Sequence, residues 1–192
     1  MAAWEKSDII SAASAACAIF VFGFGIWQYR SSENWKRSEF VASQIKEFGT
    51  DKVNQAVLLM MDYEGVRIEL FPDRPNADDR FVEVGLAMLV ESLNRESHLP
   101  PNEFQIRQYF EHFLTSLSRF NYFLESGAIE PNELCADFGY PVELMTGDAR
   151  DMKLKNVGID IAPFSKALND YLTRWDYVYV QNFLKKIQKA CK

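Results

Sequence analysis

The sequence is poor in the residues that build metal and redox sites. It contains only two His and three Cys among 192 residues. His98 and His112 have no other His or Cys at ligand spacing, so we predict no metal site and no cofactor. Cys17 lies in an uncharged segment. This leaves Cys135 and Cys191 in the rest of the chain, and we expect both to be reduced thiols.

Catalytic motifs are also missing. The Gly-x-Gly of residues 23–25 lies within an apolar run and lacks the context of a phosphate-binding loop. Arg67 has carboxylates close in sequence at Asp62, Glu64 and Glu69, but such a set is more typical of surface salt bridges than of acid–base catalysis. We therefore predict that the protein is not an enzyme.

Cations are too few for a nucleic-acid binder. The chain has 21 Lys and Arg against 27 Asp and Glu, a formal net charge of −6. Affinity for nucleic acid depends on neutralising phosphates, so we expect no direct binding of nucleic acid. The 15 Phe and 8 Tyr indicate a packed aromatic core rather than disorder.

Charge is absent altogether from residues 9–29, IISAASAACAIFVFGFGIWQY. As a helix this segment spans about 31 Å, which matches a hydrocarbon core of about 30 Å. A buried helix of a soluble protein usually has a polar face, and a signal peptide has a shorter apolar region. We therefore predict one transmembrane helix, within an N-terminal anchor of residues 1–30.

Lys and Arg flank this segment unequally. Lys6 precedes it, whereas Arg30, Lys36 and Arg37 follow it. The positive-inside rule then predicts an inner-membrane protein with its N-terminus outside and residues 30–192 in the cytoplasm.

Small residues recur four apart in the predicted membrane helix. Ser11 pairs with Ala15 and Ala12 with Ala16, and Gly23 lies two turns beyond on nearly the same face. Close backbone approach at small residues is a main source of packing energy between helices in lipid. We predict self-association through these five positions; the alternative is that Ala and Gly are simply common in such helices.

Helical patterns continue after the uncharged segment. Residues 33–48 form a polar helix that either continues the membrane helix as a stalk (31–49) or lies apart after a turn, and both alternatives stay open. Helices are predicted over 51–64, capped by Thr50 or Asp51, and over 79–95. A short extended segment is expected near 66–71.

The rest of the predicted helical bundle, residues 50–192, depends on two long apolar faces. A 4, 3, 4 spacing of apolar residues predicts a central helix over 103–126, capped by Asn102. It should pack on a last helix over 163–190, after short helices over 131–137 and 141–146. The predicted core face of the last helix is Leu168, Leu172, Trp175, Tyr179, Phe183 and Ile187. We thus expect an all-α fold.

Three residues are candidates for a ligand or partner surface. Trp175 and Tyr179 can wall a pocket, although aromatic residues at helical spacing are more typical of a core. Arg67 is the third candidate, since it lies among carboxylates after a helix end.

The run IRQYFEHFLTSLSRFNYFLESGAIEPNEL, followed by FGYPVELM and an aromatic C-terminal helix, resembles a family of small bacterial proteins. These have an N-terminal membrane anchor and a helical domain of unknown function. The resemblance covers about residues 33–190 and implies an anchored all-α domain in a bacterial inner membrane, with some relatives near phage-defence genes. It supplies no catalytic residue.

Two functions remain open at this point. The first is a non-enzymatic interaction module, complex subunit or membrane effector, with anti-phage defence as the case that the resemblance suggests. The second is a membrane-tethered enzyme or small-ligand sensor whose site is built from scattered residues. Expected partners are the lipid bilayer and either a second copy of the chain or another protein.

Overall fold

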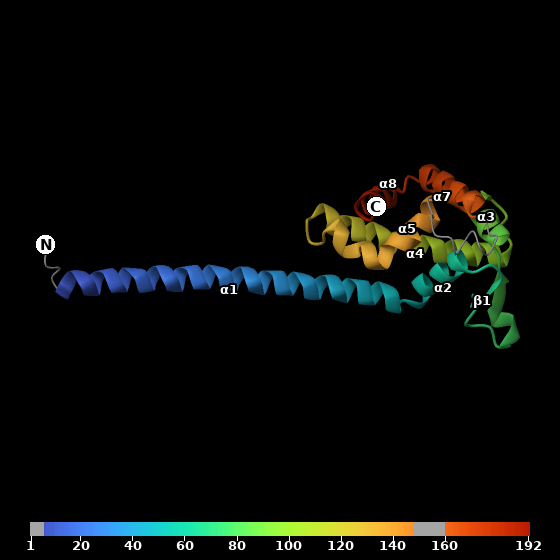
Figure 1. Cartoon of the computed structure of the whole chain (residues 1–192). Helices are drawn as coiled ribbons and strands as arrows, with labels where there is room; N and C mark the ends of the chain where they lie inside the picture. Colours follow the sequence, from blue (N-terminus) through green and yellow to red (C-terminus); the bar gives the residue numbers. More distant parts are fainter. Residues whose placement is uncertain (1–5, 148–159) are drawn as a thin grey trace. The chain divides into compact units, whose positions relative to one another are not determined.

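The computed structural model describes residues 6–147 and 160–192, and for residues 6–16, 18, 19 and 34 it describes the backbone alone. The chain divides into two compact units, Met1–Ser43 and Gln44–Lys192. The described residues are mostly helical, with one two-stranded sheet (Figure 1). The prediction of an all-α fold is therefore confirmed.

The first helix, α1 (Lys6–Thr50), is continuous (Figure 1). It includes residues 33–48, so the alternative of a separate surface helix after a turn is wrong. Ser31 and Ser32 do not interrupt the helix, because neither residue type breaks a helix strongly. Gly49 does not end it either; Thr50 does, with its hydroxyl donating to the carbonyl of Lys46 at 2.8 Å.

Within the residues that the structure describes, none of the helices has both the length and the apolar composition that a membrane crossing requires. The structure thus lends no support to the predicted transmembrane helix over residues 9–29. Four of the positions predicted for self-association, Ser11, Ala12, Ala15 and Ala16, have side chains outside the described residues. At the fifth, Gly23, a Cβ would meet nothing within 4 Å apart from the adjacent residues and the backbone of its own helical turns.

The second helix, α2 (Lys52–Asp62), begins directly after α1. Asp51 caps it, because its Oδ1 accepts hydrogen bonds from the backbone N–H groups of Val53 and Asn54, both at 2.9 Å. Of the two caps predicted, Asp51 is therefore the one used. Val57 and Met60 are buried on the apolar face of the helix.

A β-hairpin follows, and half of it was predicted as helix. Strand β1 (Val66–Glu69) lies in the segment predicted to be extended, but it pairs antiparallel with β2 (Phe81–Val84). The prediction of a helix from residue 79 was wrong, because a 3₁₀ turn, η1 (Asp78–Arg80), precedes β2. Helix α3 (Leu86–Asn94) begins only after the strand. Residues 81–84 form a strand rather than a helix because their backbone pairs with that of β1 across the intervening loop.

The central helix, α4 (Pro101–Glu125), has the predicted core face. Ile106, Phe110, Phe113, Leu114, Leu117 and Phe120 are all fully buried. The predicted cap at Asn102 was wrong: Pro101 occupies the first helical position, where its missing N–H costs nothing and its fixed φ suits the helix. Helix α4 contacts α2, α3 and α8, which makes it the centre of the bundle.

Two predicted short helices merge into one. After a 3₁₀ turn, η2 (Pro131–Leu134), helix α5 (Cys135–Thr146) continues through Pro141. The prediction of a break before this proline was wrong, because buried Phe138 and Val142, on either side of it, hold both halves in the core.

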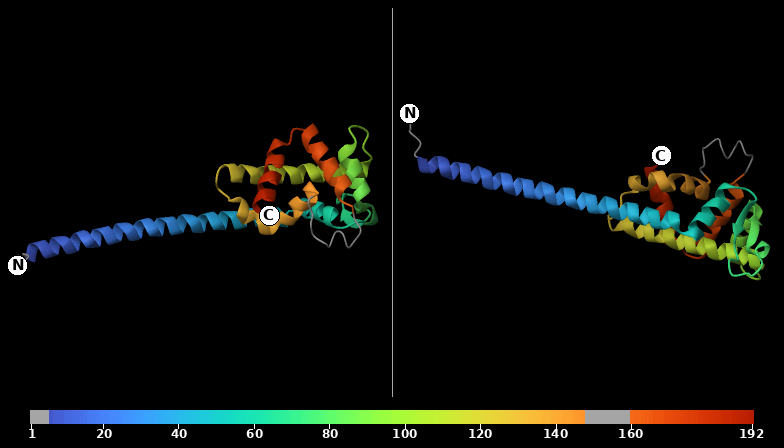
Figure 2. Two further views of the ribbon diagram at one scale, coloured as in Figure 1. Left: turned by 45° about the horizontal axis from the view of Figure 1, so that its top comes forward. Right: turned by 90° about the horizontal axis from the view of Figure 1, so that it is seen from below.

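The predicted last helix is two helices. Helix α7 (Ala162–Arg174) is capped at its C-terminus by Trp175. Asp176 then has a positive φ of 55°. Helix α8 (Val178–Ala190) therefore starts in a new direction (Figure 2). Trp175 and Tyr179 are therefore 54% and 60% exposed, and their assignment to the core was wrong. The amide of Tyr177 donates to the carbonyl of Leu172 at 2.9 Å, which closes the turn.

Five phenylalanines form the centre of the second unit. Phe48 at the end of α1 lies 4.9 Å from Phe138 and 5.6 Å from Phe113, measured between ring centroids. Phe120 lies 4.8 Å from Phe138, which also contacts Phe183 of α8 at 5.4 Å. Four helices thus meet in one aromatic cluster, as the Phe content predicts.

Cys135 and Cys191 form a disulfide bond, with their Cα atoms 5.4 Å apart. The expectation of reduced thiols was wrong, since the fold brings two residues 56 positions apart into bonding geometry. The bond joins the first residue of α5 to the residue that follows α8.

Candidate functional site

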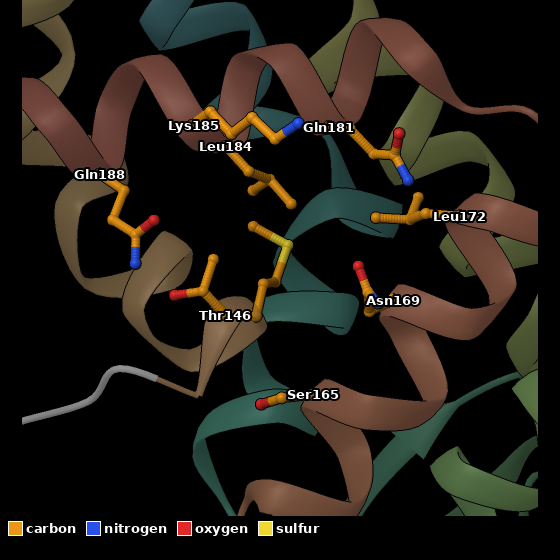
Figure 3. Close-up of a pocket in the computed structure, with 9 residues that line it drawn as sticks. Thr146, Ser165, Asn169, Leu172, Gln181, Leu184, Lys185 and Gln188 are labelled. Carbon is orange, nitrogen blue, oxygen red and sulfur yellow. The ribbon is translucent and has the colours of Figure 1, made fainter.

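A cavity of about 260 Å³ opens between α5, α7 and α8 (Figure 3). We name it the α5–α8 cavity. It is lined by Met145, Thr146, Ser165, Asn169, Leu172, Gln181, Leu184, Lys185 and Gln188. Met145, Leu172 and Leu184 supply apolar surface, and amide and hydroxyl groups surround it. The lining is mixed, and the volume lies just below the roughly 300–1,000 Å³ that is usual for small-molecule sites.

The polar groups of the α5–α8 cavity are partly engaged within the protein. The hydroxyl of Ser165 donates to the carbonyl of Leu144 at 3.0 Å, and that of Thr146 donates to the carbonyl of Val142 at 2.8 Å. Gln181 donates from Nε2 to the hydroxyl oxygen of Thr173 at 3.2 Å. Lys185 is the one charged side chain among the described residues that line the cavity. This arrangement favours binding over acid–base chemistry.

A second concavity, of about 250 Å³, lies where the end of α1, α2 and α4 meet. We name it the α2–α4 groove; it is lined by Glu47, Phe48, Asp51, Asn54, His112, Thr115, Ser116 and Arg119. Two side-chain contacts cross it. Oδ2 of Asp51 lies 3.1 Å from Nε2 of His112, and Arg119 donates to Glu47 at 3.0 Å. Both pairs hold the α1–α2 junction on α4.

The carboxyl of Asp51 is electrostatically biased toward its charged form. Partial burial opposes ionisation, but the N–H of Asn54, the ring of His112 and the N–H of Val53 outweigh it and lower the pKa of Asp51. A carboxylate at a helix N-terminus also suits the helix dipole. Asp51 therefore acts as a cap and as a partner of His112.

Asn54 has an unsatisfied polar atom at the same groove. The residue is only 2% exposed, and its Nδ2 donates to the carbonyl of Phe48 at 3.3 Å. Its Oδ1 is buried and has no hydrogen-bond partner in the structure. Such an acceptor is unusual in a folded protein, because burial without a donor is costly.

A buried polar cluster joins α3, α4 and α7. The hydroxyl of Tyr171 donates to Glu111 at 2.7 Å, and Arg107 lies 5.7 Å from the Tyr171 ring. Arg107 donates from Nε to the carbonyl of Ser92 at 2.7 Å and so caps the end of α3. Burial, followed by the bond to Glu111, raises the pKa of Tyr171 far above its usual range. The cluster is structural, since each polar group has a partner inside the fold.

The residues singled out from sequence do not form one site. Arg67 lies in the hairpin, 5.1 Å from the ring of Phe81 and 3.6 Å from a carboxylate oxygen of Asp78. Trp175 and Tyr179 lie at the α7–α8 turn. None of these three lines the α5–α8 cavity or the α2–α4 groove.

The carboxylates near Arg67 have structural roles. Asp62 accepts a hydrogen bond from the hydroxyl of Tyr140, and Glu64 accepts one from the backbone N–H of Leu86 at the start of α3. Among the described residues, no three His, Cys, Asp or Glu side chains are grouped so as to hold a metal ion.

The lining residues of both concavities were missed by reasoning from sequence. Gln181, Lys185 and Gln188 recur along α8 at helical spacing, but this pattern is equally typical of a solvated helix face. Only the packing of three helices brings them to one hollow.

Comparison with protein-family models, with curated proteins and with solved structures finds no match. The resemblance to small membrane-anchored bacterial proteins therefore stays a prediction from the sequence.

Proposed function

We propose that the protein is a single-pass membrane protein: α1 is its anchor, and residues 44–192 act without catalysis as an interaction module, complex subunit or membrane effector. The observation that carries the proposal is the apolar surface of α1 in the uncharged segment. Phe20 and Phe22 are 75% and 72% exposed. Val21, Phe24, Ile26 and Trp27 are exposed as well.

A contiguous apolar surface of this kind is typical of a site that contacts a membrane or another protein. Burial of one such side chain is worth roughly 1.5–3 kcal/mol, so six of them represent a strong drive toward an apolar phase. The side chains of residues 9–16, 18 and 19 lie outside the described part. These residues belong to the stretch from residue 9 to residue 29, which has no charge. Acyl chains are the cover that suits a segment of this length.

Two features of the chain favour opposite sides of the membrane. Three cations after the segment against Lys6 before it favour a cytoplasmic domain, but this excess is small. The disulfide between Cys135 and Cys191 favours an oxidising compartment, because cytosolic thiol systems keep most cysteines reduced. We propose that residues 44–192 lie on the oxidising side, the reverse of the orientation predicted from Lys and Arg, because the disulfide persists only where thiols are not kept reduced.

Alkaline carbonate extraction tests the anchor. Wild-type chain should stay in the membrane pellet. A variant with Val21→Lys, Phe22→Lys and Phe24→Lys should move to the supernatant, because each Lys near a bilayer centre costs about 2.5–3.5 kcal/mol. The matched control is Trp35→Lys, which alters an equally exposed apolar residue of α1 outside the uncharged segment and should leave extraction unchanged. Release of the wild-type chain would contradict the proposal.

A second candidate function, a small-ligand sensor, is favoured by the α5–α8 cavity. Its apolar surface and amide groups suit a small amphipathic molecule. A fragment screen by ligand-observed NMR should give hits that Gln181→Leu weakens. Gln108→Leu, an exposed glutamine on α4, is the control. Hits that respond equally to both variants would remove this candidate.

A further inference from the structure

The β-hairpin has one edge that a helix covers and one that is open. At the covered edge, the carbonyl of Glu69 on β1 accepts a hydrogen bond from the hydroxyl of Tyr109 on α4 at 3.2 Å. Strand β2 forms the other edge, and the hairpin lies at the periphery of the second unit (Figure 1). An open edge of this kind is a template on which another strand can pair.

The register of the hairpin shows which backbone groups lie on the open edge. The N–H of Leu70 donates to the carbonyl of Arg80 at 2.9 Å, and bonded and non-bonded residue pairs alternate along an antiparallel ladder. Phe81 and Glu83 belong to non-bonded pairs, so their N–H and C=O groups point away from β1. Among the described residues, no further backbone hydrogen bond involves either of them. Strand β2 thus offers two donors and two acceptors at strand spacing.

The side chains beside these groups are apolar and acidic. Phe81 and Glu83 are both exposed on the same face of β2, and Arg67 lies 5.1 Å from the Phe81 ring. Arg67 is itself 3.6 Å from a carboxylate oxygen of Asp78. Acidic residues outnumber basic ones by five to three in residues 66–84: Glu69, Asp73, Asp78, Asp79 and Glu83 against Arg67, Arg74 and Arg80. A strand beside β2 is therefore complementary when it brings a cation to Glu83 and an apolar side chain to Phe81.

We propose that β2 binds an extended segment of a partner protein as a third, antiparallel strand. The segment has a basic residue opposite Glu83 and an apolar residue, two positions later, opposite Phe81. Backbone hydrogen bonds give such a complex its affinity, and the two side chains give it specificity. A second copy of the hairpin would bring like charge, so another protein is the better fit. The inference rests on the proposed interaction module and names its surface.

The test is a titration of the full chain in a non-ionic detergent, with the backbone amides of Phe, Val and Glu labelled with ¹⁵N for NMR. The lysine peptide, acetyl-Thr-Lys-Thr-Phe-Thr-amide, carries the proposed pattern. We expect it to shift the amides of Phe81 and Glu83, which gain hydrogen bonds, more than the amide of Val82, which already faces β1. No shift at Phe81 and Glu83 would overturn the proposal.

A charge-reversed probe tests the complementarity. The glutamate peptide has Glu in place of Lys and is otherwise the same. Like charges directly opposite each other on a sheet are unfavourable, so we expect the lysine peptide to bind at least about threefold more tightly. Equal affinities of the two peptides would overturn the assignment of a basic partner.

Methylated probes test whether the peptide pairs as a strand. In the proposed register, the backbone groups of the Lys and Phe in the peptide face β2, and those of the central Thr face away. Methylation of the Lys and Phe amide nitrogens should abolish binding, whereas methylation of the central Thr nitrogen should leave it intact. Equal effects of the two modifications would overturn the pairing.

A matched pair of variants locates the edge. Glu83→Pro removes an N–H that faces outward, so it keeps the pairing with β1 and should abolish binding of the lysine peptide, as measured at the Phe81 amide. Glu83→Gln keeps the N–H and removes the charge. It should retain binding but reduce the preference for the lysine peptide over the glutamate peptide. Undiminished binding in Glu83→Pro would overturn the assignment to β2; if this variant unfolds the hairpin, the methylated peptides decide.

Two controls separate this inference from others. The oligomer mass in detergent should be the same for the wild-type chain and Glu83→Pro. A lower mass in the variant would mean that β2 pairs with a second copy, which would overturn the assignment to another protein. Carbonate extraction tests the anchor independently, so a chain that stays in the membrane but does not bind the lysine peptide contradicts this inference alone.

Discussion

Cys135 and Cys191 are bonded across 56 residues, and their bond joins the start of α5 to the residue after α8. Helix α8 supplies Phe183 to the aromatic core and packs on both α4 and α5. The covalent link thus keeps the C-terminal helix on the bundle. It also bears on where the domain lies, because such bonds persist in oxidising compartments.

The state of these cysteines should therefore report the compartment. Maleimide labelling before reduction should modify only Cys17, the free cysteine among the described residues, and reduction should add two labels per chain. Mass spectrometry of protein from its native host measures both numbers. Three labels before reduction would place the domain in a reducing compartment, as the Lys and Arg count predicts.

Removal of the bond should also lower stability. Cys135→Ala with Cys191→Ala should cost about 2–4 kcal/mol, since an open chain has more unfolded conformations. Cys17→Ser is the control and should leave the urea midpoint unchanged. An unaltered midpoint in the double variant would mean that the bond does not form.

Phe113 tests the assignment of the core. It is fully buried on α4, so Phe113→Ala should lower the free energy of unfolding by roughly 3–5 kcal/mol. Tyr122→Ala, on the same helix but exposed, should change it by less than about 0.5 kcal/mol. Urea unfolding followed by circular dichroism measures both values. Similar values for the two variants would refute the orientation of α4.

The positive φ of Asp176 predicts that glycine at this position does not lower the stability of the fold and can raise it. A non-glycine residue in the left-handed region is strained, so Asp176→Gly should be neutral or stabilise the fold by up to about 1 kcal/mol. Asp170→Gly, inside α7, should destabilise by about 1 kcal/mol. A loss of stability in Asp176→Gly would show that α7 and α8 form one continuous helix, as the apolar periodicity suggested.

Asp51 should contribute to stability in a way that is lost in acid, because its pKa is lowered in the folded state. Its pKa in the folded state lies below the ordinary 3.8, so the contribution is fully present above that pH and is lost as the pH falls through the folded pKa. Asp51→Asn should keep much of the capping but flatten this acidic dependence. Unfolding curves between pH 2 and pH 6 measure the effect, with Asp73→Asn in an exposed loop as control. An identical slope in Asp51→Asn and wild type would exclude this role.

The self-association predicted for the N-terminal segment can be tested separately from its insertion into the membrane. Ala12→Leu with Ala16→Leu should lower the oligomer mass in detergent, because bulky side chains keep backbones apart. The circular dichroism of the domain should not change. An unchanged mass would leave α1 as a simple tether.

Much of the helical architecture follows from the local sequence. The buried face of α4 follows from apolar residues at 4, 3, 4 spacing, and Asp51 caps α2 because its own side chain reaches two backbone N–H groups nearby. These features depend on neighbours within one or two helical turns. A periodicity or a cap is therefore readable without any knowledge of the fold.

The tertiary structure decided the features that depend on distant partners. Pairing with β1 makes a strand of Phe81–Val84, and the fold joins Cys135 to Cys191. The turn at Asp176 exposes two aromatic residues whose spacing resembles a core. Both concavities likewise collect side chains from three helices. Sequence alone carries no distance between such segments, and the free energy that selects one conformation comes from contacts that exist only after the chain has packed.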